Sequence, residues 1–334
     1  MRRSGLGLAT GLAFGLLGYG ALVFCSRRAL ADDAPLSRLH PLLHSWLAES
    51  SLEAESRYLG TPVGRIHVLV AGSGPEPIVV LPGSGASAGD LAELIARLAR
   101  NHLVVGVDLP GTGLSDPVSF SGHPQAAWSK VVTAVADELG LERFTLVGHS
   151  MGGLAAGGFA IANPTRVNRL VLISPFGVGR TIPFWWTFAM VPGVMDIRGL
   201  YERVMLVPRD EWWSRAGEGR DLGLPGEAAQ RYRRQARARF GRGSDLGLIG
   251  RLLQPLALRP ESQLLPALGL LSGRVLVLWG GMDRRLPLAP AERELRHFPG
   301  LRLEVVADAG HLLPFLKPDL TARLIESFEG GPPS

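Results

Sequence analysis

Short apolar runs alternate with segments of helical periodicity from residue 57 almost to the end of the chain. The runs are predicted to be strands, and they lie at residues 65–70, 78–81, 103–107, 144–147, 170–173, 275–278 and 303–306. Between the second and third run, Leu91, Leu94, Ile95 and Leu98 repeat at the spacing of an amphipathic helix. Strands that are apolar throughout are buried on both faces. The pattern therefore predicts an α/β fold, with a mostly parallel central sheet and helices on both faces.

One long stretch interrupts this alternation. Residues 176–265 contain no strand signal, although they hold Trp185, Trp186, Trp212 and Trp213. We interpret this stretch as a helical cap inserted between two parts of one core, residues 57–175 and 266–329, with residues 330–334 as a tail.

Residues 31–56 precede the first predicted strand and form a spacer. Apolar side chains fall near helical spacing at Leu36, Leu39, Leu43, Trp46 and Leu47. A short amphipathic helix is therefore expected here. Docking on the core is the favoured interpretation, and lying on a membrane surface is the alternative.

The first thirty residues read as a membrane segment. Residues 4–26 carry no charged side chain and are flanked by pairs of arginines. A helix of this length spans about 34 Å, enough to cross a hydrocarbon core. We favour a single-pass anchor within residues 1–30, with the rest of the chain outside the cytoplasm, over a secretory signal cleaved near Ala31.

Glycines repeat every fourth residue inside this segment, at Gly7, Gly11 and Gly15. Small residues at this spacing lie on one helix face and allow a second helix to approach, so a homodimer through this face is one hypothesis. The plainer interpretation is a hydrophobic segment that tolerates glycine.

Composition narrows the function classes. A single Cys among 334 residues excludes a disulfide-stapled fold and a cysteine-based zinc or redox site. The net charge is +5, and the basic residues form no known nucleic-acid-binding module, so no nucleic-acid partner is expected. No motif calls for a metal or a cofactor.

A G-x-S-x-G motif carries the first chemical signal. Gly148, His149, Ser150, Met151 and Gly152 follow the apolar run at 144–147 and precede a segment of small apolar residues. A serine on such a sharp turn between strand and helix is exposed, and neighbouring backbone leaves room only for glycine two residues before and after it. The setting predicts that Ser150 is a nucleophile.

A nucleophilic serine needs a base and an orienting carboxylate. His311 follows the last predicted strand, where an imidazole can reach neighbouring strand ends. Asp283 follows the strand at 275–278 and is the preferred carboxylate. Asp308 is the rival, although a carboxylate three residues before His311 more often caps a turn.

Two backbone N–H groups must stabilise the oxyanion. One is predicted to be the N–H of Met151, directly after the nucleophile. The other is expected from the loop after the strand at 78–81, with Ser84 preferred and Gly85 as runner-up.

These motifs together resemble the α/β-hydrolase superfamily, over roughly residues 57–329. The resemblance implies that Ser150, Asp283 and His311 form a catalytic triad and that residues 176–265 cover the site. The segment from Asp108 to Ser115 resembles the family's D-x-x-G-x-G-x-S turn, which shapes the site. Pro82 departs from the pattern, because many members have His there. An anchor followed by such a body is similar to membrane-bound monoacylglycerol lipases.

The leading interpretation is a serine hydrolase that cleaves a carboxylic ester with an apolar, lipid-like acyl group. A carbon–carbon bond hydrolase or a peroxidase-like member of the same fold is the alternative within the family. A non-catalytic binding scaffold is a further possibility. A dinucleotide-dependent oxidoreductase is also considered, because glycines at 83, 85 and 89 follow a strand and Asp108 comes later. That interpretation leaves Ser150 and His311 without a role.

Overall fold

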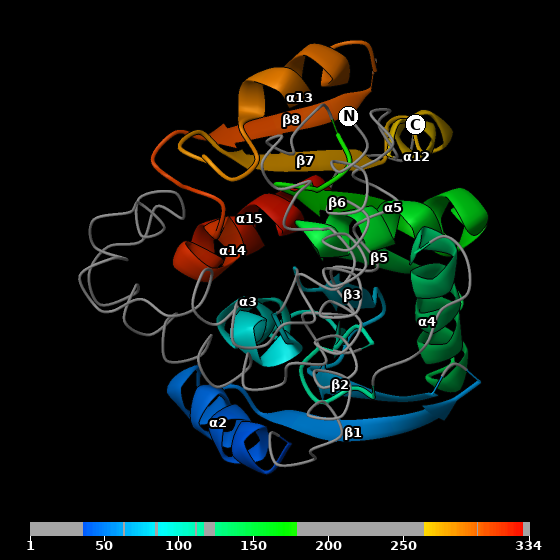
Figure 1. Cartoon of the computed structure of the whole chain (residues 1–334), viewed down its shortest axis with the longest axis vertical. Helices are drawn as coiled ribbons and strands as arrows, with labels where there is room; N and C mark the ends of the chain where they lie inside the picture. The colour runs from blue at the N-terminus through cyan, green and yellow to red at the C-terminus, as the bar shows by residue number, and fades with distance from the viewer. Residues whose placement is uncertain are drawn as a thin grey trace, which may run out of the picture.

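The computed structural model describes residues 36–62, 64–83, 86–110, 112–116, 124–178, 264–298 and 300–329. These residues contain one sheet, whose eight strands are β1 (Ala54–Thr61), β2 (Gly64–Ala71), β3 (Ile78–Leu81), β4 (Val104–Val107), β5 (Phe144–His149), β6 (Val167–Ile173), β7 (Val275–Gly280) and β8 (Leu301–Val306). Their order across the sheet is β1-β2-β4-β3-β5-β6-β7-β8 (Figure 1). Strand β2 is antiparallel to both of its neighbours, and the pairs from β4 to β8 are parallel. The predicted, mostly parallel sheet is confirmed.

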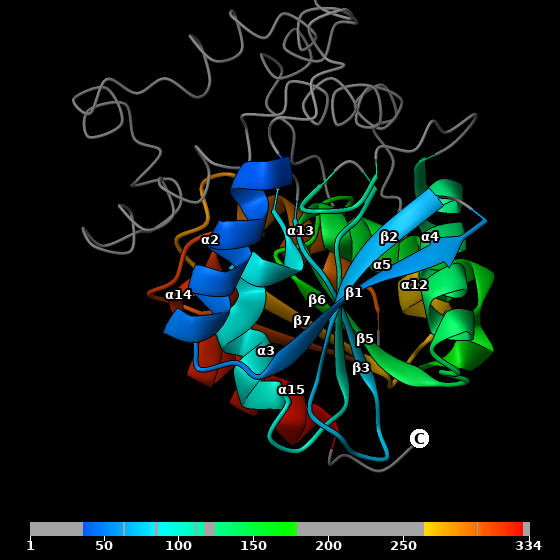
Figure 2. The same ribbon diagram turned by 90° about the horizontal axis from the view of Figure 1, so that it is seen from below.

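Helices cover both faces of the sheet (Figure 2). One face carries α4 (Pro124–Glu138), α5 (Met151–Ala162), α12 (Leu265–Leu270) and α13 (Leu288–Leu295). The other carries α2 (Leu36–Glu49), α3 (Ala92–Leu98), α14 (Leu313–Leu316) and α15 (Pro318–Glu329). Two short 3₁₀ helices, η1 (Ala88–Leu91) and η2 (Pro164–Arg166), complete the described elements.

Alternate side chains of the central strands supply the two cores. Leu146 of β5 packs into the core beneath α4 and α5, whereas Val147 faces the core beneath α3 and α15. Val277 and Leu278 of β7 divide in the same way. A strand with an apolar residue at every position therefore fits only the interior of a sheet that is covered on both sides.

Strand β1 was not predicted, and the boundary expected at residue 57 falls inside it. Of its eight residues only Leu59 is buried, and an ion pair joins the exposed side chains of Arg57 and Glu55 at 2.6 Å. Charged and half-exposed side chains are common on edge strands, where they discourage pairing with other chains. The strand has no apolar run, because most of its side chains are exposed or only half-buried, and it pairs with β2 alone. The sheet therefore begins at Ala54, within the expected spacer.

The helix expected in the spacer is α2, and it docks on the core. Leu43 and Trp46 are buried. They pack over Gly89 of η1, where an added Cβ would lie 2.8 Å from an atom of each side chain. The apolar face of the helix thus meets protein at these two positions.

The predicted anchor at residues 1–30, the tail at 330–334 and residues 179–263 of the predicted cap lie outside the described residues. None of the helices in the described ranges is both long enough and apolar enough to cross a membrane.

Replacing Trp46 with alanine tests the docking of α2. Because this side chain is buried, Trp46→Ala is expected to lower the free energy of unfolding by about 3 kcal/mol. His44 is exposed on the same helix, so His44→Ala should change stability by less than about 0.5 kcal/mol. Urea denaturation followed by circular dichroism measures both. Equal effects of the two substitutions would show that α2 does not pack on the core in solution.

Candidate active site

Ser150 occupies a strained turn between β5 and α5. Its backbone has φ 53° and ψ −115°, outside the regions that residues with a side chain normally adopt. A Cβ at Gly148 would lie 2.4 Å from the carbonyl oxygen of Gly152, and a Cβ at Gly152 would lie 2.2 Å from that of Leu81. Both glycines are therefore required by close backbone contacts, as the motif predicts.

A chain of hydrogen bonds connects the three side chains predicted to act together. The Nε2 atom of His311 lies 3.0 Å from Oγ of Ser150, and its Nδ1 lies 2.8 Å from Oδ2 of Asp283. His311 and Asp283 are buried, and Ser150 is half-buried. With Nδ1–H donated to the carboxylate, the lone pair of Nε2 faces the serine hydroxyl. The imidazole is thus arranged to accept the serine proton.

Backbone donors hold the carboxylate of Asp283. Its Oδ1 accepts the N–H of Arg285 at 2.9 Å and that of Leu286 at 2.8 Å. These bonds leave Oδ2 pointing at His311 and fix the orientation of the group.

The rival carboxylate lies elsewhere. Asp308 is exposed, and Lys317 donates to its Oδ2 at 2.5 Å. This hydrogen bond lowers the pKa of Asp308 below its usual value. The geometry favours Asp283 as the partner of His311.

The predicted oxyanion donors are placed in part. Met151 is the first residue of α5, and the first N–H groups of a helix have no acceptor within it. Ser84 and Gly85 lie outside the described residues. Their neighbour Gly83 is close to the predicted nucleophile, since an added Cβ there would lie 3.2 Å from Cβ of Ser150.

A second Ser–His–Asp arrangement occurs near the edge of the sheet. Nε2 of His67 lies 2.9 Å from Oγ of Ser56, and Nδ1 lies 2.8 Å from Oδ2 of Asp108. Ser56 belongs to the middle of β1, so its backbone has neither the turn nor the helix start found at Ser150. We interpret this group as a polar clasp between strands.

The clasp bears on the dinucleotide-binding alternative. Besides His67, the carboxylate of Asp108 accepts the N–H of Ala88 at 2.6 Å and that of Leu114 at 2.8 Å. Its side chain is 1% exposed. A carboxylate committed to three donors cannot receive the hydroxyls of a ribose, so the structure argues against that alternative.

The described residues leave a small cavity, ≈ 40 Å³, beside the hydrogen-bonded chain. Ser150 and His311 line it together with the following side chains, which spacing alone did not identify: Asp90, Leu91, His149, Arg285, Leu312, Pro314 and Phe315. The apolar residues just after His311 were a usable signal, because Leu312 follows it directly and Pro314 and Phe315 lie in the short helix α14 that comes next.

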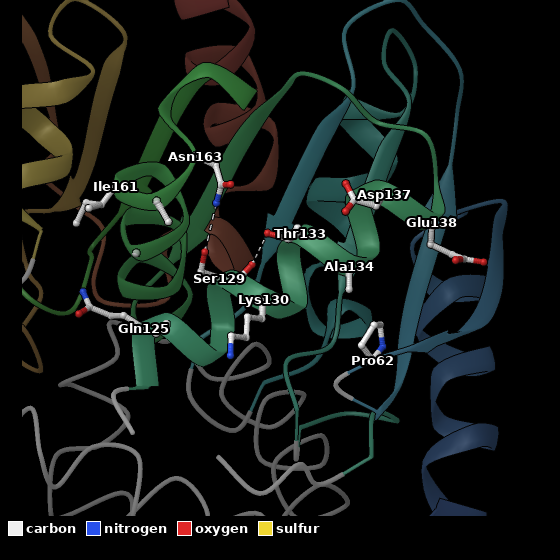
Figure 3. A pocket seen from close by; sticks show the side chains of 13 residues that line it. Pro62, Gln125, Ser129, Lys130, Thr133, Ala134, Asp137, Glu138, Ile161 and Asn163 are labelled. Atoms are coloured by element: carbon white, nitrogen blue, oxygen red, sulfur yellow. Dashed lines mark hydrogen bonds between the residues drawn. The ribbon is translucent and has the colours of Figure 1, made fainter. Parts of the chain in front are cut away.

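A larger hollow, ≈ 900 Å³, lies along α4 and the C-terminal part of α5, against Pro62 of the β1–β2 turn (Figure 3). Its polar rim includes Lys130 and Asp137, and Ser129 there receives a hydrogen bond from Asn163 at 3.4 Å. Among the described residues that line it there is no histidine, so this part of the hollow has no counterpart of the Ser150–His311 contact.

His149, the residue before Ser150, is one of the side chains that line the small cavity. Its ring also contacts the base. Nε2 lies 2.8 Å from the backbone oxygen of His311, and the two rings are 5.0 Å apart between centroids. Sequence could not indicate this bond, because 162 residues separate the partners.

Two relatives cover most of the chain. One is the 2-hydroxy-6-oxononadienedioate/2-hydroxy-6-oxononatrienedioate hydrolase of Cupriavidus pinatubonensis, to which the chain is 29% identical over 280 residues. This alignment covers 80% of the chain and 91% of the relative. The chain is 32% identical over 293 residues to the dihydrolipoyllysine-residue acetyltransferase component of the acetoin cleaving system of Cupriavidus necator, covering 84% of this chain and 71% of the relative.

Solved structures share the fold at lower identity. A membrane phospholipase A matches with a TM-score of 0.66 at 22% identity, covering 98% of both chains. The naproxen esterase of Bacillus subtilis matches with a TM-score of 0.58 at 21% identity, covering 87% of this chain and 96% of the esterase.

The sequence model of the alpha/beta hydrolase family matches residues 78–324. This range runs from β3 into α15 and contains Ser150, Asp283 and His311. The chain therefore belongs to the alpha/beta hydrolase family.

Proposed function

We propose that this protein is a serine hydrolase that cleaves carboxylic esters with an apolar acyl group, through an acyl-enzyme on Ser150. One observation carries the proposal: at the strained turn before α5, Oγ of Ser150 meets Nε2 of His311, whose Nδ1 meets Asp283. Nucleophile, base and orienting carboxylate are in contact without any rearrangement.

The chemistry follows from these contacts. Oγ of Ser150 attacks the ester carbonyl carbon while its proton passes to Nε2 of His311. The N–H of Met151 and a donor from the loop after β3 stabilise the negative charge on the carbonyl oxygen. His311 then gives the proton to the departing alkoxide, and the acyl group stays on Oγ. Water, deprotonated by the same imidazole, releases the acid and restores the serine.

Apolar walls support an apolar substrate. Leu91, Leu312 and Phe315 line the cavity beside Ser150, and burial of an acyl chain against such side chains is favourable. In this proposal, residues 4–26 anchor the enzyme in a membrane as a single span, which would place the site near lipid substrates.

Hydrolysis of a carbon–carbon bond is the second candidate. It is supported by the 29% identity to a hydrolase named for an oxo-dienedioate. Arg285 also lines the cavity, and a guanidinium there would suit a substrate carboxylate. The two candidates share Ser150 and differ in the group that leaves.

Loss of the Ser150 hydroxyl should abolish the chemistry. Ser150→Ala is expected to lower kcat on p-nitrophenyl butyrate by at least about 10⁴-fold and to prevent labelling by a fluorophosphonate probe. Ser56→Ala is the matched control, because it removes the hydroxyl of the second Ser–His–Asp group and should keep both properties. Labelling and turnover that depend on Ser56 instead of Ser150 would refute the assignment, and a wild-type protein that shows neither would favour a binding scaffold.

The two candidate carboxylates, Asp283 and Asp308, give a second test. Asp283→Asn should lower kcat by about 10³- to 10⁴-fold, because the amide favours the wrong tautomer of His311. Asp308→Asn breaks only an exposed contact with Lys317, so kcat should stay within about twofold. Steady-state kinetics of both variants decides between them, and the reverse pattern would transfer the role to Asp308.

Substrate preference separates ester from carbon–carbon bond cleavage. The values of kcat/KM for p-nitrophenyl esters should rise as the acyl chain lengthens from acetate to octanoate, since each buried methylene is worth about 0.8 kcal/mol. A 2-hydroxy-6-oxo-dienedioate should be cleaved more slowly than the preferred ester. Faster cleavage of the dienedioate, with a flat ester series, would favour the second candidate.

A further inference from the structure

The ring of His149 touches both of the segments that flank the nucleophile. On one side, its Nε2–H donates to the backbone carbonyl of His311 at 2.8 Å. This hydrogen bond holds the backbone of His311, whereas the hydrogen bond with Asp283 holds its imidazole. His311 follows β8 on a loop, so the position of its imidazole depends on how that backbone is held.

On the other side, the ring supports the loop after β3. A Cβ at Gly83 would lie 3.0 Å from Nδ1 of His149 and 3.2 Å from Cβ of Ser150. Gly83, at the start of the loop that is expected to supply an oxyanion donor, therefore lies beside this imidazole. The ring of His149 thus lies against both the backbone of His311 and Gly83.

The environment keeps the ring neutral. Burial, reinforced by repulsion from His311, lowers the pKa of His149 to about 3. The hydrogen bond to the backbone of His311 and the charge of Asp283 both oppose this lowering of the pKa, whereas Arg285 adds to it. The charge matters because His311 becomes an imidazolium in every turnover, only 5.0 Å away between ring centroids. A second cation there would oppose proton transfer from Ser150.

We propose that His149 is a positioning residue for the acyl-transfer reaction, acting through the backbone of His311 and the loop at Gly83. The inference rests on the proposed function of Ser150. Its physical basis is that a misplacement of about 1 Å between reacting groups can cost about 10²-fold in rate. A ring that only filled space would not need the Nε2–H donor.

Three substitutions separate the hydrogen bond from the volume. His149→Phe keeps a ring and removes the donor. His149→Gln can place an amide N–H near the position of Nε2, whereas the shorter side chain in His149→Asn reaches only to that of Nδ1. We expect Phe and Asn to lower kcat on p-nitrophenyl acetate by about 10- to 100-fold with KM within about threefold, and Gln to stay within about fivefold of wild type. Rates of fluorophosphonate labelling should fall in parallel with kcat.

The loop contact has its own test, which does not depend on the folding of the His149 variants. Gly83→Ala should lower kcat, because the new methyl presses on Nδ1 and moves the loop. Gly269→Ala is the control, since nothing lies within 4 Å of a Cβ there. Thermal unfolding of each variant shows whether lost activity reflects lost structure.

The outcomes distinguish the two proposals. Wild-type kcat in His149→Phe, an equal loss in Phe and Gln, or a loss confined to KM would each overturn the positioning role while leaving Ser150 as the nucleophile. A wild-type protein that neither turns over esters nor takes the probe would overturn the proposed function itself. Rescue by Gln, with loss in Phe and Asn, supports the positioning role.

Discussion

The left-handed backbone of Ser150 is the constraint on which the site depends. A residue with a side chain does not hold φ 53° unless its surroundings leave no alternative. Here the N–H of Ser150 donates to Ile173 of β6, and its carbonyl accepts the N–H of Phe176. Close packing of Gly152 on Leu81 blocks relaxation toward β3. Contacts with the neighbouring parallel strands β6 and β3 therefore maintain the strained backbone of the turn.

The same sheet edge brings His311 and Asp283 together. The loops after β7 and β8 are joined by backbone hydrogen bonds, from Gly281 to Val306 at 2.8 Å and from Met282 to Ala309 at 2.9 Å. Asp283 lies on the loop after β7, directly after these bonded residues, and His311 lies on the loop after β8. The hydrogen bonds therefore hold the two loops side by side. The parallel pairing of β7 with β8 sets the register of the two strands, and the contact between Asp283 and His311 lies just beyond the end of that pairing. Parallel topology explains why residues so distant in sequence meet.

Sequence predicted the features that local pattern determines. Uniformly apolar runs marked the interior strands, and glycines around Ser150 marked the turn. Edge strand β1 was missed because Leu59 is its only buried residue, and the contacts of His149 and His67 were missed because their partners lie far along the chain. These contacts arise from tertiary packing: His67 of β2 meets Ser56 of β1 and Asp108 after β4, and His149 at the end of β5 meets the loop after β8. No spacing rule encodes them, although each involves a buried histidine.

Two Ser–His–Asp groups in one chain show that side-chain contacts alone do not define a nucleophile. Their distances differ by no more than 0.1 Å, at 2.9 and 2.8 Å for Ser56 and 3.0 and 2.8 Å for Ser150. The backbones differ. Successive N–H groups of a strand point to opposite sides in the plane of the sheet, so they cannot converge on one oxygen beside Ser56. At Ser150 the N–H groups of Met151 and Gly152, the first two residues of α5, lie at the start of the helix, where the N–H groups have no acceptor four residues earlier in the helix. Stabilisation of the developing oxyanion, which the backbone supplies, is therefore what separates a reactive serine from a structural one.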